Sequence, residues 1–192
     1  PILSIQTKLT KSEECVLEIR DMGSIVIEAK YILEIVRKID ADEIEFEMID
    51  GSLTKISGNT AEFRINGMRA NEYPAIDFSK PKECFALKEE TLKKVILQTS
   101  FATSDKETRP VLTGVNFHCE GNTLNCVATD SYRLAKKTID IKESLNFNIT
   151  IPAKSLSEVV KTLEGEGEVE IAVNDKKAQF IIHDTIVQTR LI

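Results

Sequence analysis

The chain has 192 residues, of which 42% are hydrophobic, and a formal net charge of −6. A chain of this length can hold one large domain or two small ones, each with a core of its own. No apolar run approaches the ~18 residues of a membrane-spanning helix, and an acidic chain is a poor candidate for coating nucleic acid nonspecifically.

The first elements along the chain are two expected strands, at about 2–9 and 15–20, followed by a short strand and a helix within 25–39. The helix has apolar residues at positions i, i+3, i+4 and i+7, namely Ile32, Ile35, Val36 and Ile39. This spacing forms one apolar stripe, which we expect to be buried.

The same strand and helix recur later in the chain. Residues 149–163 repeat residues 25–39 at an offset of 124 without a gap, with six of fifteen positions identical, where chance would give about one. A weaker copy covers residues 85–99. Two unrelated amphipathic helices do not explain a repeat that includes the preceding strand. The stripes of the later copies are Leu92, Val95, Ile96 and Thr99, then Leu156, Val159, Val160 and Leu163.

Three strands are expected after each of the last two helices, at 114–119, 123–128 and 132–138, then at 168–173, 177–183 and 186–192. Short turns such as Gly121–Asn122 join antiparallel neighbours. Each unit therefore has the order βαβββ, and two units make an α+β domain of about 120 residues.

The four cysteines, at 15, 84, 119 and 126, form no CxxC pair. A two-residue turn at Gly121–Asn122 would place Cys119 opposite Leu124 rather than opposite Cys126. We therefore expect no disulfide between these two, and four free thiols in a reducing cytoplasm.

A break between domains is expected near residues 76–81, where two prolines bracket a stretch without a clear period. Residues 79–192 then hold two units, whereas residues 1–78 hold one full unit preceded by only two strands. Nothing before Ile25 resembles the strand and helix of residues 85–99. The repeat therefore predicts that the chain starts in the middle of its first domain, and the lack of an initiator methionine agrees.

Positive charge gathers on the three expected helices. They carry a net charge of +4, so the rest of the chain carries −10. Lys30 and Arg37 stand seven positions apart, as do Lys154 and Lys161, so each pair shares a helix face. On charge alone, a solvated face is the more ordinary explanation. If the units close into a ring with the helices inward, however, these side chains would make salt-sensitive, sequence-independent contacts with phosphates.

Catalytic motifs are absent from the sequence. The two histidines, His118 and His183, fall within strand patterns, and neither has the spacing of a metal ligand. No GxSxG, HExxH, P-loop or GxGxxG motif is present. The sequence predicts no catalytic residue, no metal site and no cofactor.

Four segments carry a resemblance to a known family: GSIVIEAK at 23–30, NEYP at 71–74, ETRPVLTGV at 107–115 and ATDSYRLA at 128–135. Together they resemble the beta subunit of bacterial DNA polymerase III, the DNA sliding clamp, in the same order and over essentially the whole chain. The last two motifs are specific, whereas the first alone would be weak.

The resemblance implies the DNA clamp fold, in which antiparallel sheets lie outside and helices line a ring. It implies a three-domain protein that forms a head-to-tail homodimer around duplex DNA when full length. Residues 1–78 would be the C-terminal part of domain one and residues 79–192 a nearly complete domain two, with the third domain absent from this chain.

The implied function is that of a processivity factor, a non-catalytic subunit of the DNA polymerase III holoenzyme in the cytoplasm. The implied partners are double-stranded DNA, the catalytic subunit of DNA polymerase III and the clamp loader. Other polymerases and repair proteins would dock through short clamp-binding peptides, and no membrane is involved.

The helix charges and the resemblance together place nine residues against DNA. Lys106 and Arg109 belong to the loop after the middle helix, where some family members have aromatic residues and this chain has Pro110 and Val111. The expected DNA-facing residues are Lys30, Arg37, Lys38, Lys93, Lys94, Lys106, Arg109, Lys154 and Lys161.

The resemblance also implies two protein-binding sites. Phe63 and Ile65 would be the apolar contacts of the strand that closes the ring. The wall of the peptide groove would be Leu112, Thr129, Ser131, Tyr132, Arg133 and Leu134. The leucines could supply an apolar floor and Thr129 and Arg133 polar anchors for an extended peptide. From the residues alone, Leu134 could equally be a core residue and Arg133 a surface strand residue.

Two other functions fit part of the sequence. A protein–protein adaptor of repeated βαβββ domains, with no DNA role, would show the same repeat. An enzyme would need catalytic groups outside these residues. The basic helices and the ATDSYRLA motif favour the clamp.

Overall fold

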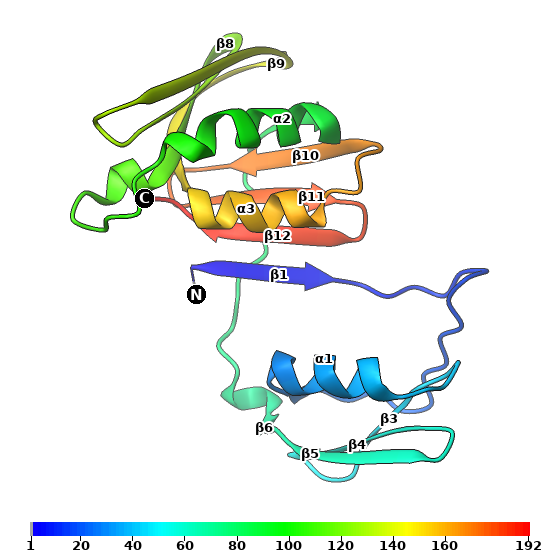
Figure 1. Ribbon diagram of the computed structural model, residues 1–192. Helices are drawn as coiled ribbons and strands as arrows, with labels where there is room; N and C mark the ends of the chain where they lie inside the picture. The colour runs from blue at the N-terminus through cyan, green and yellow to red at the C-terminus, as the bar shows by residue number, and fades with distance from the viewer. Residues whose placement is uncertain (1) are drawn as a thin grey trace. The chain divides into compact units, whose positions relative to one another are not determined.

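Residues 2–192 are described in the computed structural model and form two compact units (Figure 1). The large unit contains residues 2–10 and 78–192, and the small unit contains residues 11–77. The division at 77/78 lies one residue from the expected domain break. Residues 2–10 belong with the large unit because β1 (Leu3–Thr7) pairs with β12 (Thr185–Arg190).

The large unit is built on a five-stranded antiparallel sheet in the order β1-β12-β11-β10-β7. Two long strands, β8 and β9, pair with each other, and α2 and α3 contact one another beside the sheet (Figure 1). In addition to β1 and β12, the elements are β7 (Glu83–Lys88), α2 (Glu89–Thr99), η2 (Ser100–Ala102), η3 (Pro110–Thr113), β8 (Gly114–Thr129), β9 (Leu134–Pro152), α3 (Ala153–Thr162), β10 (Glu168–Val173) and β11 (Lys177–Ile182).

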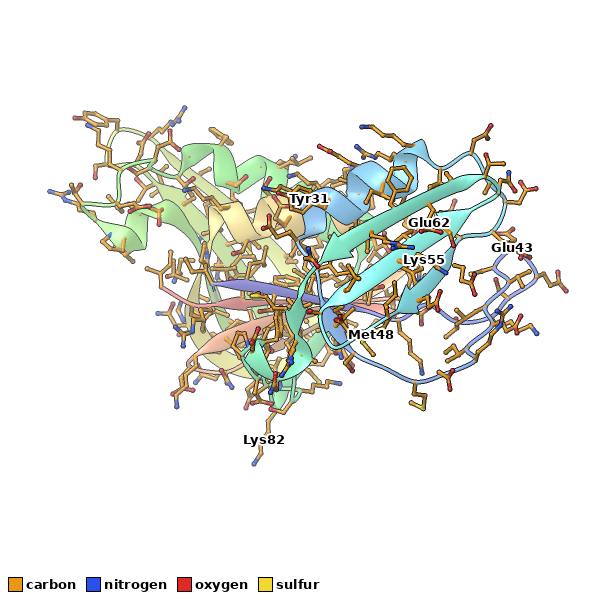
Figure 2. All side chains as sticks on the ribbon, turned by 90° about the horizontal axis from the view of Figure 1, so that it is seen from below. Tyr31, Glu43, Met48, Lys55, Glu62 and Lys82 are labelled. Atoms are coloured by element: carbon orange, nitrogen blue, oxygen red, sulfur yellow. The ribbon has the colours of Figure 1, made fainter. Side chains whose placement is uncertain are left out.

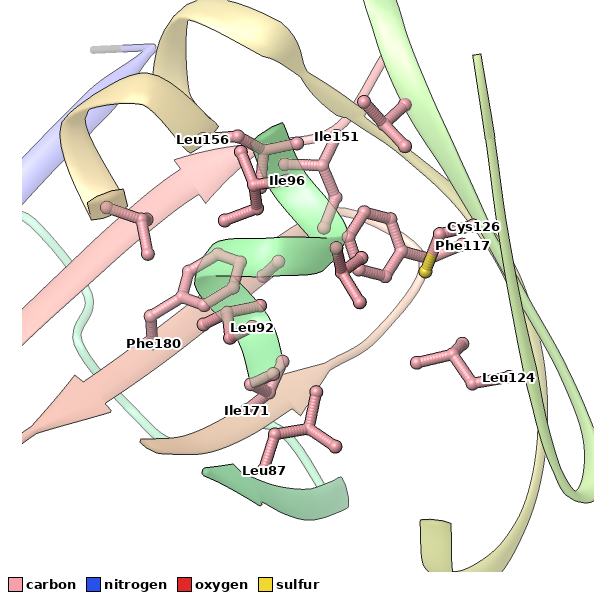
Figure 3. Close-up of a cluster of buried hydrophobic side chains, with 14 of the residues drawn as sticks. Leu87, Leu92, Ile96, Phe117, Leu124, Cys126, Ile151, Leu156, Ile171 and Phe180 are labelled. Carbon is pink, nitrogen blue, oxygen red and sulfur yellow. The ribbon is translucent and has the colours of Figure 1, made fainter. Parts of the chain in front are cut away.

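Helix α2 lies at the centre of the core. Figure 3 shows Leu92 of α2 beside Phe180 and Ile171 of the sheet, whereas Phe117 and Cys126 of β8 approach the helix from the other side. All four residues of the expected α2 stripe are buried, which confirms the stripe. Burial of apolar side chains on both sides of one helix joins the sheet and the β8–β9 pair into a single hydrophobic core.

Strand β8 is one continuous run but folds back at the expected turn. Its first part pairs with the end of β9 and its last part with the start of β9, with a register break between Gly121 and Thr123. Gly121 has a φ of 61°, a left-handed conformation that glycine adopts without strain. A straight strand would separate Phe117 from Cys126 by about 30 Å, yet both lie against α2 in Figure 3. The turn predicted at residues 121–122 is therefore present, as a sharp bend within β8.

The repeat is visible in the helix boundaries. Helix α1 (Ala29–Lys38) and helix α3 (Ala153–Thr162) begin and end at positions related by the offset of 124. Each follows a residue in extended conformation, Glu28 or Pro152, and each ends at a residue that is again extended. The α+β fold with antiparallel sheets is confirmed.

The small unit contains α1 and two small sheets, one in the order β3-β4-β5 and one pairing β2 with β6. Its buried apolar core consists of Ile39, Ile56 and Ile65. Apolar side chains reach its surface, among them Tyr31 and Met48, which are labelled in Figure 2. Its elements are β2 (Ile25–Val26), α1, β3 (Glu45–Met48), β4 (Leu53–Gly58), β5 (Ala61–Asn66), β6 (Met68–Arg69) and the short 3-10 helix η1 (Ala70–Glu72).

Three sequence expectations were wrong. Residues 15–20 form no strand, because the described residues supply no partner strand beside them. The third strand of the middle unit starts at Leu134 rather than 132, because a side-chain-stabilised turn occupies the preceding residues. The α1 stripe is only partly buried: Ile39 is buried, Ile32 and Ile35 are half-buried and Val36 is exposed, because the small unit offers too little apolar surface to cover the whole stripe.

The cysteines are all free, and two of them are buried. Burial, and then the neighbouring Cys119, raises the pKa of Cys126 from an ordinary value of 9.0 to about 12, and burial raises the pKa of Cys119. Only the thiolate reacts with alkylating agents. At pH 8 we therefore expect iodoacetamide to leave Cys119 and Cys126 unmodified in the folded protein.

Mass spectrometry of the alkylated protein measures this protection. Protein unfolded in urea at the same pH provides the control, because all four thiols should then react. Modification of Cys126 in the folded protein at the rate seen in urea would contradict its burial.

Candidate functional site

A hollow of about 300 Å³ lies on the large unit where η3 meets β8 and β9. Of the expected groove residues, Leu112 and Thr129 line it. The fold-back of β8 brings its two halves together, so residues from both ends of the strand contribute to the lining. The lining residues are Val111, Leu112, Gly114, Asn116, Val127, Ala128, Thr129 and Thr150.

Gly114 allows the close approach that shapes one wall of this hollow. A Cβ atom at Gly114 would lie 2.6 Å from the carbonyl oxygen of Ile151 and 2.8 Å from Cγ2 of Thr150. Any larger residue would push the start of β8 away from the end of β9. The neighbouring Asn116 holds the same two strands together, since its Nδ2 donates to Oδ1 of Asn148 at 2.8 Å.

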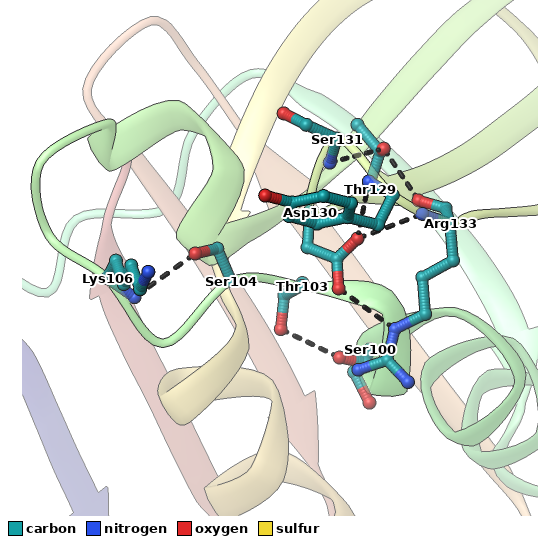
Figure 4. A network of polar contacts seen from close by, with 9 residues as sticks. Ser100, Thr103, Ser104, Lys106, Thr129, Asp130, Ser131 and Arg133 are labelled. Atoms are coloured by element: carbon teal, nitrogen blue, oxygen red, sulfur yellow. Dashed lines mark hydrogen bonds and ion pairs between the residues drawn. The ribbon is translucent and has the colours of Figure 1, made fainter.

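The turn between β8 and β9, residues 130–133, follows directly on Thr129 of the hollow, and we call it the rim. A network of polar contacts stabilises this turn (Figure 4). Asp130 Oδ1 accepts hydrogen bonds from the backbone N–H groups of Tyr132 and Arg133, both at 3.0 Å. Thr129 Oγ1 accepts from the Ser131 N–H at 3.1 Å and donates to the Arg133 carbonyl at 2.7 Å. The two backbone bonds, from Tyr132 first, lower the pKa of Asp130, so the carboxylate is charged at neutral pH.

Large apolar side chains are exposed around the rim. Tyr132 is 98% exposed, Leu134 65%, Val111 59% and Phe101 58%. Leu134 pairs with Thr129, which lines the hollow, and Arg133 contacts Phe101. Clustered exposed apolar groups of this kind mark interaction surfaces. The alternative in which Leu134 belongs to the core is therefore wrong.

The structure brings the expected groove residues to one place. Leu112 and Thr129 line the hollow, whereas the other four, Ser131 to Leu134, do not line it but are exposed in and directly after the adjoining turn. Sequence reasoning missed Phe101, Asp130, Asn116 and Thr150. Asp130 could have been found, because aspartate commonly accepts hydrogen bonds from backbone N–H groups at the start of a turn.

The basic residues of the large unit lie on its surface. Lys93 and Lys94 on α2 and Lys154 and Lys161 on α3 are all exposed, and the two helices lie side by side. Lys94 pairs with Glu90 at 2.6 Å and Lys161 with Glu158 at 2.7 Å. Such exposed pairs contribute little free energy and can open to a phosphate.

Backbone hydrogen bonds join the two ends of the loop that carries Lys106 and Arg109. The Ser104 N–H donates to the Leu112 carbonyl at 2.8 Å, and the Leu112 N–H donates to the Arg109 carbonyl at 3.0 Å. Both basic side chains are exposed. The loop therefore connects the end of the α2–η2 segment to the wall of the hollow.

In the small unit, Lys30, Arg37 and Lys38 are exposed on α1. Lys30 pairs with Glu28 at 3.1 Å, and its Nζ lies 4.6 Å from the centre of the Tyr31 ring. The hydrogen bond from Lys30 to Glu28 raises the pKa of this lysine, so it keeps its positive charge.

The expected ring-closing strand is β5, which lies at one edge of its sheet. Ile65 is buried in the small core, and Phe63 packs against that core. The exposed residues of β5 are Glu62, Arg64 and Asn66, and Arg64 pairs with Glu62 at 2.9 Å. Phe63 is only half-buried, and the role of Phe63 and Ile65 in closing a ring stays a prediction.

Each of the two histidines lies beside a glutamate carboxylate. His183 Nε2 lies 3.1 Å from Oε1 of the buried Glu89, whose other oxygen accepts the Gly165 N–H at 2.6 Å. His118 Nε2 lies 3.5 Å from Glu120. No group of His, Cys, Asp and Glu side chains in the described part of the chain could hold a metal ion. None of the helices among residues 2–192 is long and apolar enough to cross a membrane.

The fold is that of the DNA polymerase sliding clamps. The crystal structure of the sliding clamp from Bacillus subtilis superposes with a TM-score of 0.94 at 35% identity, covering 99% of this chain and 51% of that one. The putative DNA polymerase III beta subunit from Eubacterium rectale superposes with a TM-score of 0.90 at 30% identity, covering 99% of this chain and 51% of that one.

Sequence comparison identifies the family. Residues 2–77 match the N-terminal domain and residues 86–192 the central domain of the DNA polymerase III beta subunit. The beta sliding clamp of Halalkalibacterium halodurans is 39% identical over 99% of this chain and 52% of its own length. The chain belongs to the DNA polymerase III beta subunit family, and it spans about half the length of the curated relatives it matches.

Proposed function

We propose that these residues are part of a sliding clamp that encircles duplex DNA and holds the replicative polymerase to it. The observation that carries the proposal is the match to beta sliding clamps over 99% of the chain. Residues 1–78 would belong to clamp domain one and residues 79–192 to domain two, and the ring would be a cytoplasmic homodimer closed through β5. The protein would act as a non-catalytic subunit of the polymerase.

The exposed lysines of α2 and α3 support a DNA-facing surface. Four of them lie on two adjacent helices of a chain whose net charge is −6. A clamp that slides needs attraction to phosphates without recognition of bases, which lysines on a helix surface can supply. In this proposal Lys106, Arg109 and the basic residues of α1 extend that surface.

The hollow and its apolar rim support a second role, the docking of extended peptides. The floor is apolar at Val111, Leu112 and Val127, and polar groups stand at Thr129 and Arg133. Sites that bind extended peptides typically have an apolar floor and a small number of polar groups that point toward the ligand. The partners would be the polymerase, its clamp loader and repair proteins.

The DNA-facing surface is tested by neutralising Lys93 and Lys154, which form no ion pair among the described residues. Lys93→Gln combined with Lys154→Gln should weaken binding to a fluorescent 30-bp duplex at low ionic strength. The slope of log K against log salt should become less steep by about 0.9 per lysine. Fluorescence anisotropy over a salt series measures both quantities.

Lys82→Gln combined with Lys176→Gln makes the same charge change at exposed positions outside the helices. This control should retain the slope of the unmodified chain. If both double variants lose affinity equally, or if neither does, the helices do not face DNA. The adaptor function would then become the better explanation of the fold.

A further inference from the structure

The turn between β8 and β9 holds one side chain more tightly than an exposed turn requires. Arg133 is exposed, yet its Nε donates to Asp130 Oδ2 at 3.0 Å. The Asp130 side chain is only 20% exposed, and its other oxygen already accepts two backbone N–H groups of the same turn. The carboxylate thus fixes the backbone of the turn and the arginine side chain together (Figure 4).

A second contact restrains the same guanidinium from another element. Arg133 Cζ lies 5.7 Å from the centre of the Phe101 ring on η2, within the range at which a cation is attracted to an aromatic face. Phe101 is more than half exposed, so core packing does not account for its position. An ion pair and an aromatic face therefore hold one long side chain that would otherwise be free to rotate.

The two terminal nitrogens of Arg133 remain available. Within the described residues the only hydrogen bond of its guanidinium is the one from Nε to Asp130. A guanidinium can donate two parallel hydrogen bonds to a carboxylate, or single ones to carbonyl oxygens. Arg133 can therefore take an acceptor oxygen of a ligand without breaking its contact with Asp130.

We propose that Asp130 and Phe101 are positioning residues that preorganise Arg133 to receive a carbonyl or carboxylate oxygen of a peptide bound in the hollow. The inference rests on the proposed peptide-docking function and adds the residues that set its geometry. Restraining a side chain before binding reduces the entropy lost when the ligand binds. Neither residue needs to contact the peptide.

The substitutions at Asp130 separate its two roles. Asp130→Asn retains an oxygen that can accept the Tyr132 and Arg133 N–H groups, but it places an NH2 group, which cannot accept, opposite Arg133 Nε. Asp130→Ala removes both roles. Asp140→Asn, at an exposed position on β9, is the matched control, since it makes the same charge change away from the turn.

The first measurement is the Nε–Hε NMR signal of Arg133 in the free chain of residues 1–192. We expect a distinct, slowly exchanging signal in the unmodified chain and in Asp140→Asn, and its loss in Asp130→Asn without a change in thermal midpoint. A fast-exchanging signal in the unmodified chain would overturn the inference, because Arg133 would then not be restrained.

The second measurement is the affinity for a fluorescein-labelled peptide that carries the clamp-binding segment of the catalytic subunit of DNA polymerase III. Asp130→Asn should weaken binding five- to tenfold and Phe101→Leu two- to threefold. In an Arg133→Ala background both effects should disappear, because the two residues act through Arg133. If Asp130→Asn or Phe101→Leu still weakens binding in the Arg133→Ala background, these residues do not act through Arg133, and the inference is overturned.

The two measurements distinguish the inference from the function on which it rests. If the unmodified chain shows a restrained Arg133 but binds no peptide, the peptide-docking function fails. If the peptide binds tightly and Asp130→Asn leaves its affinity unchanged, docking stands and the positioning role fails.

Discussion

Replacing Leu134 or Arg133 by alanine is expected to weaken the binding of a clamp-binding peptide at least tenfold. Leu134 is 65% exposed beside the hollow and has no structural need to be apolar there. Truncation of a central interface anchor commonly costs about 1–3 kcal/mol, and 1.4 kcal/mol corresponds to a factor of ten. Titration of the fluorescent peptide against the chain and its variants measures the effect.

Leu97→Ala provides the control for this titration. Leu97 is 56% exposed on α2 and does not line the hollow, so its truncation should leave the peptide affinity unchanged. If the two rim variants bind as tightly as the unmodified chain, the groove lies elsewhere. If the unmodified chain itself does not bind, the adaptor function has to be considered again.

Replacing Phe180 by alanine is expected to lower the free energy of unfolding of the large unit by about 3–5 kcal/mol. Phe180 is fully buried on β11 and packs near Leu92 of α2. Its removal leaves a cavity between sheet and helix that close-packed neighbours can fill only in part. Urea unfolding followed by circular dichroism measures the loss.

Phe101→Ala removes the same side chain from an exposed position of the same unit. Its effect should be within about 0.5 kcal/mol, as is usual for surface substitutions. Because the chain has two compact units, a separate transition of the small unit should not move with Phe180→Ala. A loss below 1 kcal/mol for Phe180→Ala would mean that the core can repack around the missing ring.

The placement of the candidate groove could be predicted only in part. The motif match selected six residues, of which two line the hollow and four lie in or directly after the adjoining turn. The alternation of residues alone did not show whether Leu134 faces the core. The side on which a strand residue points depends on where pairing begins. Here β8 ends at Thr129, and the turn that Asp130 stabilises postpones the start of β9 to Leu134.

The sequence by itself determined the repeat, the three helices and the buried stripe of α2, because these depend on local periodicity within one segment. The turn at Gly121–Asn122, where β8 bends back, could also be predicted from the sequence. Only the tertiary structure decided that Asn116 and Thr129 line one hollow, and that Phe101 restrains Arg133. These contacts join residues far apart in sequence. They form only when the core brings β8, β9 and η2 together, so no local pattern encodes them.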